Sequence, residues 1–424
     1  MDNNNRFDLS DYLIHFFRDI DLSSNSSIIM PEHMGWQNIS EGEFLPAFFM
    51  LRAVLRNGRL WATWSERNGK STIYGLNPAI CFTEMPIAAF LEAGLKRQRA
   101  GQAMSPFALV FPKEALFRLG ARPVISGLSI GSSSYPTTVS EGYRTLPEKS
   151  LPINEQYRYV TYNLGERNID WTHEREWRYP YRGDMYDYNQ QLKKYGMIEN
   201  WYDIPGLELT KSSLGVKGIG VIVNSQKQAE LVISDILTLV DSGRALIDTF
   251  SFVLNSSLVL SKLVNLHDPF ETSRALQESM MDLSPYFSIT DKESRQYEEV
   301  FSKLAKEVEN SAEMPMYGEV GGCWLWFHDN THPCTRGLLK AGRIFVNKDG
   351  RYLAQLKEFN LSRDLKQLQN MTTRLSLKLE SQFNIKSCYF SVLHSFISEQ
   401  VPFYAGKHHD NISFYNTSWN ISNR

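Results

Sequence analysis

Residues 174–181 read Glu-Arg-Glu-Trp-Arg-Tyr-Pro-Tyr, and this run decides that the first half of the chain contains a sheet. Aromatic and polar side chains alternate along it, which is the period of a β-strand with two different faces. If the run is a strand, Glu174, Glu176 and Arg178 share one face. Two carboxylates on one face repel each other unless a cation or a ligand compensates them. The run therefore predicts both a strand and a candidate site.

Strand and helix signals alternate on both sides of this run. Apolar spacing predicts a helix over Phe44–Asn57, with Gly58 as its left-handed cap, and a second helix over Ile87–Arg99. Strands are predicted at Ala79–Thr83, Phe107–Phe111, Gln156–Tyr162 and Val216–Asn224, and a long loop over Ser126–Ser150. This mixture predicts an α+β domain with a small, mostly antiparallel core.

Helical periods dominate after about residue 240. We expect helices over Arg244–Leu283, Lys292–Val308 and Arg363–Gln382, with strands at Gly321–Phe327 and Tyr389–Leu393. A chain of 424 residues exceeds one ordinary core. The sequence therefore predicts a catalytic domain over residues 1–235 and a helix-rich α+β accessory domain over residues 236–424.

Composition is that of a globular protein, with 42% apolar and 22% charged residues. Four cysteines are too few for a disulfide framework. The polar start lacks the layout of a secretion signal, and no apolar run reaches the roughly 18 residues of a membrane span. These features predict a cytoplasmic protein with no membrane partner.

Charge is unevenly distributed although the net charge is only −2. Between Arg52 and Arg122 there are eleven lysines and arginines against four acidic residues. Such an excess attracts a phosphodiester backbone. The alternative is an ordinary solvated surface whose partners lie elsewhere in the sequence.

The two glutamates, Glu174 and Glu176, suit chemistry at an acetal-like carbon. One carboxylate stabilises an oxocarbenium-like transition state or binds a ribose hydroxyl, and the other moves a proton. The alternative is a salt-bridge ladder, because alternating glutamate and arginine commonly forms one on a sheet face.

Two other motifs of the first half are weaker by themselves. His15 lies in a short apolar run, where a histidine is more often a core residue. Residues Cys81–Glu84 end a predicted strand, but the thiol has no base nearby in sequence to activate it.

A possible zinc site in the second half has the spacing C-x4-H-x3-H-x-C, from Cys323, His328, His332 and Cys334. Its residue types fit zinc, but its spacing is not that of the common zinc modules. The alternative is a packed aromatic core around Trp324 and its neighbours, and we assign no metal ligand.

The order of the motifs in the first half resembles the DarT-like ADP-ribosyltransferases. The resemblance to these enzymes rests on His15-Phe16 and on the phrase LRAVLRNGRL at residues 51–60. Two further blocks, CFTEMP at residues 81–86 and EREWR at residues 174–178, look like those of a wider group of bacterial phage-defence proteins that includes the AbiG type. Together the motifs cover roughly residues 10–225. The composite is similar to the mRNA-modifying toxins of toxin–antitoxin–chaperone defence systems.

This resemblance implies a split antiparallel sheet and NAD as co-substrate. It implies that Glu176 holds the ribose 2′-hydroxyl and stabilises the oxocarbenium ion, that Glu174 orients or deprotonates the acceptor, and that His15 is a third catalytic residue in contact with NAD. Together with nearby aromatic residues, the expected NAD-binding set is His15, Phe16, Arg52, Arg56, Tyr74, Phe82 and Thr83.

The function implied is that of a toxin in phage defence that transfers ADP-ribose from NAD to nucleic acid, RNA rather than DNA. The implied protein partners are a neutralising antitoxin and a chaperone, and residues 236–424 would bind substrate or antitoxin. Two alternatives stay open. One is an NAD-hydrolysing or glycosidase-like enzyme that uses the same glutamates, and the other is a non-enzymatic sensor or antitoxin in which the Glu/Arg strand is structural.

Overall fold

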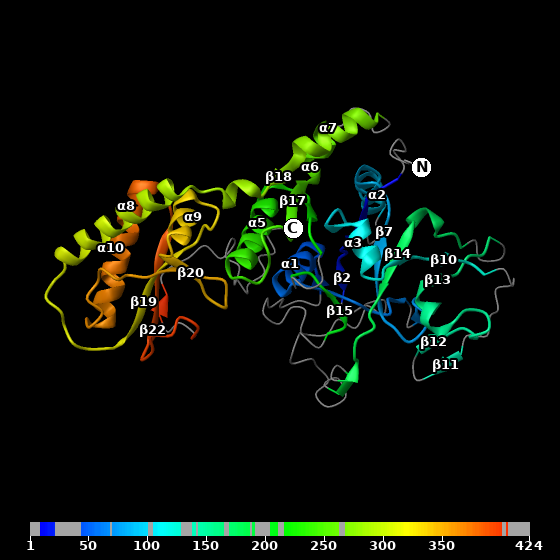
Figure 1. The fold of residues 1–424 in the computed structure, drawn as a ribbon, viewed down its shortest axis with the longest axis horizontal. Coiled ribbons are helices and arrows are strands. Elements are labelled where there is room, and N and C mark those ends of the chain that lie inside the picture. Colours follow the sequence, from blue (N-terminus) through cyan, green and yellow to red (C-terminus); the bar gives the residue numbers. More distant parts are fainter. Residues whose placement is uncertain are drawn as a thin grey trace. The chain divides into compact units, whose positions relative to one another are not determined.

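A computed structural model describes most of the chain, and the chain divides into two compact units (Figure 1). The described residues are 9–21, 44–67, 70–100, 105–128, 138–140, 143–164, 169–186, 189–190, 204–210, 216–262, 268–400 and 404–405. The first unit comprises residues 1–229, 246–281 and 421–424, and the second comprises residues 230–245 and 282–420. The boundary expected at residue 235 falls inside helix α5 (Gln226–Asp241), and residues 246–281 belong to the first unit.

An eight-stranded sheet forms the centre of the first unit, in the order β18-β17-β16-β8-β1-β7-β14-β9. Its strands are β1 (Tyr12–Phe16), β7 (Ala79–Thr83), β8 (Ala108–Pro112), β9 (Arg122–Pro123), β14 (Glu176–Pro180), β16 (Ile219–Val223), β17 (Phe250–Asn255) and β18 (Met280–Asp282). Strands β16 and β17 are parallel, whereas the pairs from β16 through β8, β1, β7 and β14 to β9 are antiparallel. The α+β class predicted from the sequence is confirmed.

The junction between β1 and β7 is a narrow part of this sheet. Ile14 and Thr83 form its one residue pair among the described residues. By contrast, β1 pairs with β8 at five positions and β7 pairs with β14 at five positions. We call this junction the seam and use the name for Ile14, His15, Cys81 and Thr83. The sheet therefore consists of two well-paired halves that meet at the seam.

Helices cover both faces of the sheet. Helix α2 (Ile87–Arg99) packs on the face that carries Ile14, where Phe90 lies in a buried cluster with Ile14 and Val110. Helices α6 (Ser256–Lys262) and α7 (Pro269–Ser279) contribute Val259 and Ala275 to the same cluster. Helix α1 (Ala47–Asn57) contacts the opposite face, because the ring of its Phe48 lies 5.4 Å from that of Phe107. Gly58 ends α1 at φ 65°, as predicted.

One helix predicted from the sequence is wrong in part. Residues 244–283 form β17, α6, α7 and β18 rather than a long helix. The run Phe250–Asn255 is rich in aromatic and aliphatic residues and pairs in parallel with β16. Gly220 permits this pairing, because a Cβ atom there would lie 2.1 Å from the Phe252 ring. Close strand packing therefore explains a glycine that matches no phosphate-binding motif.

The strand predicted over Gln156–Tyr162 is also wrong in part. Residues Ile153–Arg158 form the 3₁₀ helix η2, and only Tyr159–Val160 (β13) is extended. The buried Gln156 amide donates to the carbonyl oxygens of Leu146 and Leu151 and accepts from the Leu146 amide. These bonds to residues outside the turn stabilise it against the local strand preference.

Short two-stranded sheets complete the first unit. They pair β2 (Ile20–Asp21) with β3 (Phe44–Leu45), β4 (Arg59–Trp61) with β15 (Gly206–Glu208), β5 (Glu66–Arg67) with β6 (Lys70–Ser71), β10 (Ile125–Ser126) with β13, and β11 (Thr138–Ser140) with β12 (Tyr143–Thr145). A short helix, α3 (Lys113–Arg118), follows β8. Part of the loop predicted over residues 126–150 is therefore a small hairpin.

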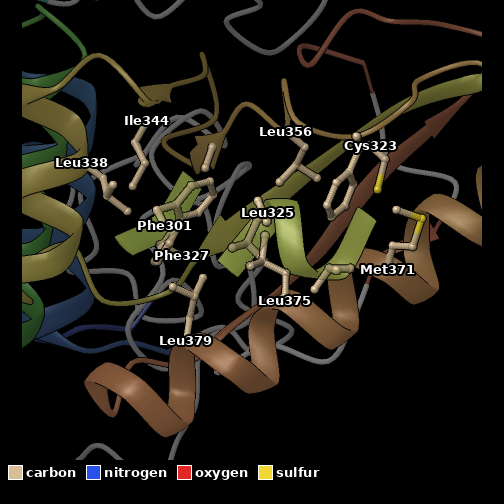
Figure 2. Packing of buried hydrophobic residues seen from close by; sticks show 14 of the residues in the cluster. Phe301, Cys323, Leu325, Phe327, Leu338, Ile344, Leu356, Met371, Leu375 and Leu379 are labelled. Atoms are coloured by element: carbon tan, nitrogen blue, oxygen red, sulfur yellow. The ribbon is translucent and has the colours of Figure 1, made fainter. Parts of the chain in front are cut away.

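An antiparallel five-stranded sheet forms the second unit, in the order β20-β21-β19-β22-β23. Its strands are β19 (Gly321–Phe327), β20 (Ile344–Val346), β21 (Tyr352–Ala354), β22 (Ser387–Leu393) and β23 (Tyr404–Ala405). Helices α8 (Asp291–Asn310), α9 (Pro333–Lys340) and α10 (Leu365–Phe383) belong to the same unit. Figure 2 shows Leu375 and Leu379 of α10 packed towards Leu325 and Phe327 of β19.

Helix ends in the second unit follow ordinary capping chemistry. Thr290 and Glu293 form a reciprocal capping box at the start of α8, and Asp364 caps α10. The helices predicted over residues 292–308 and 363–382 are confirmed to within two residues at each end. No helix in the described part of the chain is both long and apolar enough to cross a membrane.

Candidate functional site

Glu176 opens β14 beside the seam, in one cross-strand row with Thr83 and Ile14. The Arg178 guanidinium donates two hydrogen bonds to the Glu176 carboxylate, from Nε to Oε1 at 2.7 Å and from Nη2 to Oε2 at 3.4 Å. Arg178 is buried and also donates through Nη1 to the carbonyl oxygens of Tyr157 and Tyr159, at 2.7 and 3.3 Å. The Glu176 side chain keeps 20% of its surface exposed. Arg178 thus fixes the orientation of the Glu176 carboxylate, which remains partly accessible to solvent.

Cys81 lies opposite Arg178 in the β7–β14 register. Burial raises the pKa of its thiol, the Glu176 carboxylate raises it further, and Arg178 acts in the opposite direction. A thiol in this setting stays protonated near neutral pH. Cys81 therefore forms part of the wall beside Glu176 and is a poor nucleophile.

Glu174 lies outside the strand to which the sequence assigned it. Residues Thr172–Glu174 form the 3₁₀ turn η3, and Arg175 has φ 46°, so the strand begins at Glu176. A left-handed residue breaks the alternation that would put both glutamates on one face. The turn is held to the seam because Thr83 Oγ1 donates to the Glu174 carbonyl oxygen at 2.6 Å.

The carboxylate of Glu174 has its own cation. Arg97 of α2 approaches it at 2.7 Å, and the two side chains are 31% and 17% exposed. Repulsion between Glu174 and Glu176 is therefore compensated by two different arginines. Thr83 contacts the backbone of Glu174 and pairs with Glu176, so the two glutamates flank the same end of β7.

His15 lies on the opposite face of the sheet from Glu176. Its ring contacts those of Phe17 and Phe82, with centroids 5.1 and 5.9 Å away. Its Nδ1–H donates to the Cys81 carbonyl oxygen at 2.9 Å. Burial lowers the pKa of His15 to about 4, and the bond to Cys81 opposes that shift only in part. A neutral imidazole therefore bridges β1 and β7 where their own pairing ends.

The structure divides the expected NAD-binding set between the two faces. Thr83 lies on the face of Glu176, and Phe16 packs 6.0 Å from Phe90 of α2 on that same face. Phe82 faces the other way with His15. Side-chain parity across paired strands causes this division, because neighbouring residues on a strand point to opposite faces.

Three other members of that set are buried elsewhere. Arg52 and Arg56 of α1 are only 7% and 9% exposed, and the Arg52 guanidinium lies 5.9 Å from the Phe48 ring. Tyr74 is 3% exposed, lies edge-on to Tyr159 and is covered by Arg144 at 4.3 Å. These three side chains contribute to packing, and none lies on the surface beside Glu176.

The basic stretch is neutralised in part inside the first unit. Besides Arg97, its Lys96, Lys113 and Arg118 pair with Glu92, Glu84 and Glu114. Glu84 also accepts from Trp177 Nε1 at 2.7 Å, so it joins the ends of β7 and β14. Four of the eleven cations thus have carboxylate partners and three others, Arg52, Arg56 and Arg59, are buried, so only part of the excess counted along the sequence reaches the surface.

The four residues of the possible zinc site do not converge on one point. Cys323 Sγ contacts Thr372 Oγ1 at 3.4 Å, and His328 Nε2 contacts Cys388 Sγ at 3.2 Å. His332 caps α9, where its Nδ1 accepts from the Cys334 amide. No group of three or more potential ligands suited to a metal occurs among the described residues.

Sequence reasoning missed an open groove at the edge of the sheet, next to Arg178. Its volume is about 560 Å³, and its lining includes Arg122, Tyr157, Tyr179, Tyr181 and Arg182. The only signal in the sequence is the run Tyr-Pro-Tyr-Arg-Gly at residues 179–183, directly after the Glu/Arg block. Tyr157 could not be added to it from sequence, because η2 was expected to be a strand.

Comparison with known proteins adds little to this geometry. Residues 288–417 match the model of a family described as "Protein of unknown function (DUF4427)", and this segment lies within the second unit. No curated protein and no solved structure matches the chain. The chain is therefore similar, over part of its second unit, to a family whose function is unknown.

Proposed function

We propose that the first unit transfers ADP-ribose from NAD to nucleic acid, RNA rather than DNA, as a toxin in phage defence. The observation that carries the proposal is the setting of Glu176. Its carboxylate is partly exposed, is held by two donors of the buried Arg178, and lies where the sheet narrows to one residue pair. A carboxylate with this support is held in one orientation and keeps lone pairs for a ligand.

Transfer of ADP-ribose from NAD requires a carboxylate that can stabilise positive charge on the ribose. When the bond between C1′ of the ribose and nicotinamide breaks, positive charge develops on the ribose and nicotinamide leaves as a neutral molecule. Glu176 would accept a hydrogen bond from the ribose 2′-hydroxyl and stabilise that charge. The acceptor atom then bonds to C1′ and gives up its proton, for which the nearby Glu174 is the candidate base.

Only some of the expected residues fit NAD. Glu176, Glu174, Thr83 and Phe16 lie on the α2 face of the sheet, and Arg97 of α2 is a partly exposed cation in the same region. Arg52 and Arg56 are buried, which argues against a role for them at the phosphates. His15 becomes a positioning residue, because it acts on β7 through the Cys81 carbonyl oxygen.

The proposal includes a cytoplasmic location and a neutralising protein partner. Cys81, Cys323, Cys334 and Cys388 are all free thiols, which fits a reducing compartment. The second unit is the candidate binding region for the neutralising protein.

The test uses full-length protein and NAD labelled in the adenylate phosphate. Free nicotinamide and label on RNA are followed with and without RNA. We expect RNA labelling in the wild type and a loss of at least about a hundredfold in Glu176→Gln, because one electrostatic contact to the transition state is removed. The matched control is Glu278→Gln, since Glu278 also pairs with a cation, Lys262 at 3.2 Å, in the same unit.

Each outcome selects one hypothesis. Nicotinamide release without RNA labelling would favour an NAD-hydrolysing enzyme that uses the same glutamates. A wild-type protein that is folded and inert in both assays would reject enzymatic NAD chemistry and favour a sensor or antitoxin. Equal loss in both variants would show that Glu176 acts through stability, and thermal unfolding of both checks this.

A further inference from the structure

The groove beside Arg178 has the composition of a surface that binds single-stranded nucleic acid. Such surfaces combine a cationic track for the phosphates with aromatic side chains on which bases stack. Here Arg122 and Arg182 supply the cations, and the partly exposed Tyr179 and Tyr181 supply the aromatic rings. The groove volume, about 560 Å³, is in the range of sites that hold a small ligand or a few nucleotides.

The two arginines are free to bind an anion in different ways. Arg122 is held in place, because its Nη1 donates to the carbonyl oxygens of Phe117 and Ala121 at 2.7 Å and its guanidinium stacks 4.0 Å from the Phe117 ring. Its other donors have no hydrogen bond to a described residue. Arg182 is exposed and forms no ion pair within the part of the chain that the structure describes. A cation held by hydrogen bonds and an exposed one thus share the groove.

The acidic residue of the groove does not cancel this charge. Glu155 pairs with Arg158 at 2.7 Å, so Arg122 and Arg182 remain as net positive charges. Tyr179 and Tyr181 are two residues apart on β14 and its continuation, so they share a face at a spacing of roughly 6.6 Å. This arrangement offers two rings to successive bases of an extended strand.

The groove is linked to Glu176 through Arg178. Arg178 donates through Nη1 to the backbone carbonyl oxygen of Tyr157, one of the residues that line the groove, and through Nε to Glu176. Tyr179 alternates with Arg178 along β14, so its ring lies on the opposite face of the sheet from the Glu176 carboxylate. A strand stacked on Tyr179 and Tyr181 would therefore have to pass around the edge of the sheet to bring an acceptor nucleotide to Glu176.

We propose that this groove binds the single-stranded RNA acceptor. The inference rests on the proposed function for its choice of RNA, but its binding test needs no NAD. Full-length protein is titrated into a fluorescein-labelled single-stranded oligoribonucleotide, and anisotropy is read over a range of salt concentrations. We expect Arg182→Gln to weaken binding about fivefold and to reduce the salt slope by about 0.7. Tyr181→Leu should weaken binding by roughly tenfold, because a stacked base loses its platform.

A matched control is Arg118→Gln, since Arg118 is an exposed arginine of the same unit that pairs with Glu114 outside the groove. It should bind RNA like the wild type. Wild-type RNA affinity in both Arg182→Gln and Tyr181→Leu would overturn the proposal. So would an unchanged RNA affinity with a raised KM for NAD, because the groove would then bind the dinucleotide. RNA binding that depends on the groove in a protein without transferase activity would keep this inference and reject the proposed function.

Discussion

Both units bury an arginine against carboxylates, but they use it differently. In the second unit Arg343 contacts Glu298 and Glu358, and its remaining donors go to Ser302 and the Gln355 carbonyl oxygen. In the first unit Arg178 donates through Nε and Nη2 to Glu176, and through Nη1 to the backbone carbonyl oxygens of Tyr157 and Tyr159. In the second unit, Glu298 has two cations, Arg343 and Lys357, and Glu358 is nearly buried. In the first unit, Glu176 is partly exposed and pairs with one cation among the described residues.

This difference indicates that Arg343 stabilises the fold of the second unit, whereas Arg178 positions the Glu176 carboxylate. The Arg343 side chain is 1% exposed, and its partner Glu358 is 5% exposed. Partial burial would raise the pKa of Glu298, but hydrogen bonds and charge from Arg343 outweigh it and hold that pKa below the ordinary value. No further ligand is needed to balance this group. Glu298 and Glu176 are similarly exposed, at 23% and 20%, so the difference lies in their cations: Glu298 pairs with Arg343 and Lys357, whereas Glu176 pairs with Arg178 alone among the described residues.

The largest effect is expected from Arg343→Met. It leaves two carboxylates facing each other without a cation, which costs about 3–5 kcal/mol of unfolding free energy. Urea denaturation measures this loss. The triple variant Arg343→Met, Glu298→Leu, Glu358→Met removes the charges together and should recover most of the stability. If the single variant is as stable as the wild type, the cluster is not a stabilising one.

Arg178→Lys tests the other side of the comparison. Lysine keeps the charge but cannot make the paired contact to Glu176, so the carboxylate is no longer oriented. We expect RNA labelling to fall by about a hundredfold, the usual penalty for a small displacement of a catalytic group. Arg343→Lys is the matched control and should lower stability while leaving the rate constant of folded protein unchanged. An equal fall in both variants would contradict a special role for Arg178.

Part of this comparison could be predicted from the sequence, and part could not. The alternation in residues 176–180 is local, so the strand and the proximity of Glu176 to Arg178 were predictable. Helices α8 and α10 were predictable for the same reason, because their apolar period and their caps are local features of the sequence. By contrast, the left-handed Arg175 depends on hydrogen bonds to the end of β7, and these are not local.

Register explains why the site residues were harder to group. His15, Phe82 and Glu176 come from three strands, and only the pairing of Ile14 with Thr83 and of Thr83 with Glu176 decides which side chains share a face. A shift of one residue would reverse every assignment. The groove depends on η2, whose turn is held by a buried glutamine 10 residues from its partner Leu146. Neither relation is visible in a single sequence.

His15 predicts a pH dependence that is specific to the seam. Its folded-state pKa is about 4, against an ordinary value of 6.5. As the pH falls from 6.5 towards 4, His15 takes up a proton in the unfolded chain before it does so in the folded protein. The free energy of unfolding therefore decreases over this range, and the decrease ends below the folded-state pKa. For a half-buried group we expect at most about 2 kcal/mol between pH 7.5 and pH 4.5.

The measurement is urea denaturation over that pH range, with hydrogen exchange of β1 as a local readout. His15→Asn keeps a donor near the Cys81 carbonyl oxygen but does not titrate, so its stability should fall less steeply with pH. His173→Asn is the control for an exposed histidine outside the seam, because the His173 side chain is 60% exposed. Identical slopes in all three proteins would mean that His15 is protonated as readily in the folded state as in the unfolded one.

The smallest effect is expected from Lys357→Ala, and it tests whether the Arg343 cluster is complete. Lys357 approaches Glu298 at 3.3 Å but is 65% exposed, so solvent and salt screen the pair. Its removal should cost no more than about 1 kcal/mol, and less in high salt. A loss as large as that of Arg343→Met would mean that Arg343 does not satisfy its glutamates alone. The second unit would then share with Glu176 the property of an incompletely compensated carboxylate, and the distinction between the two arginines would no longer hold.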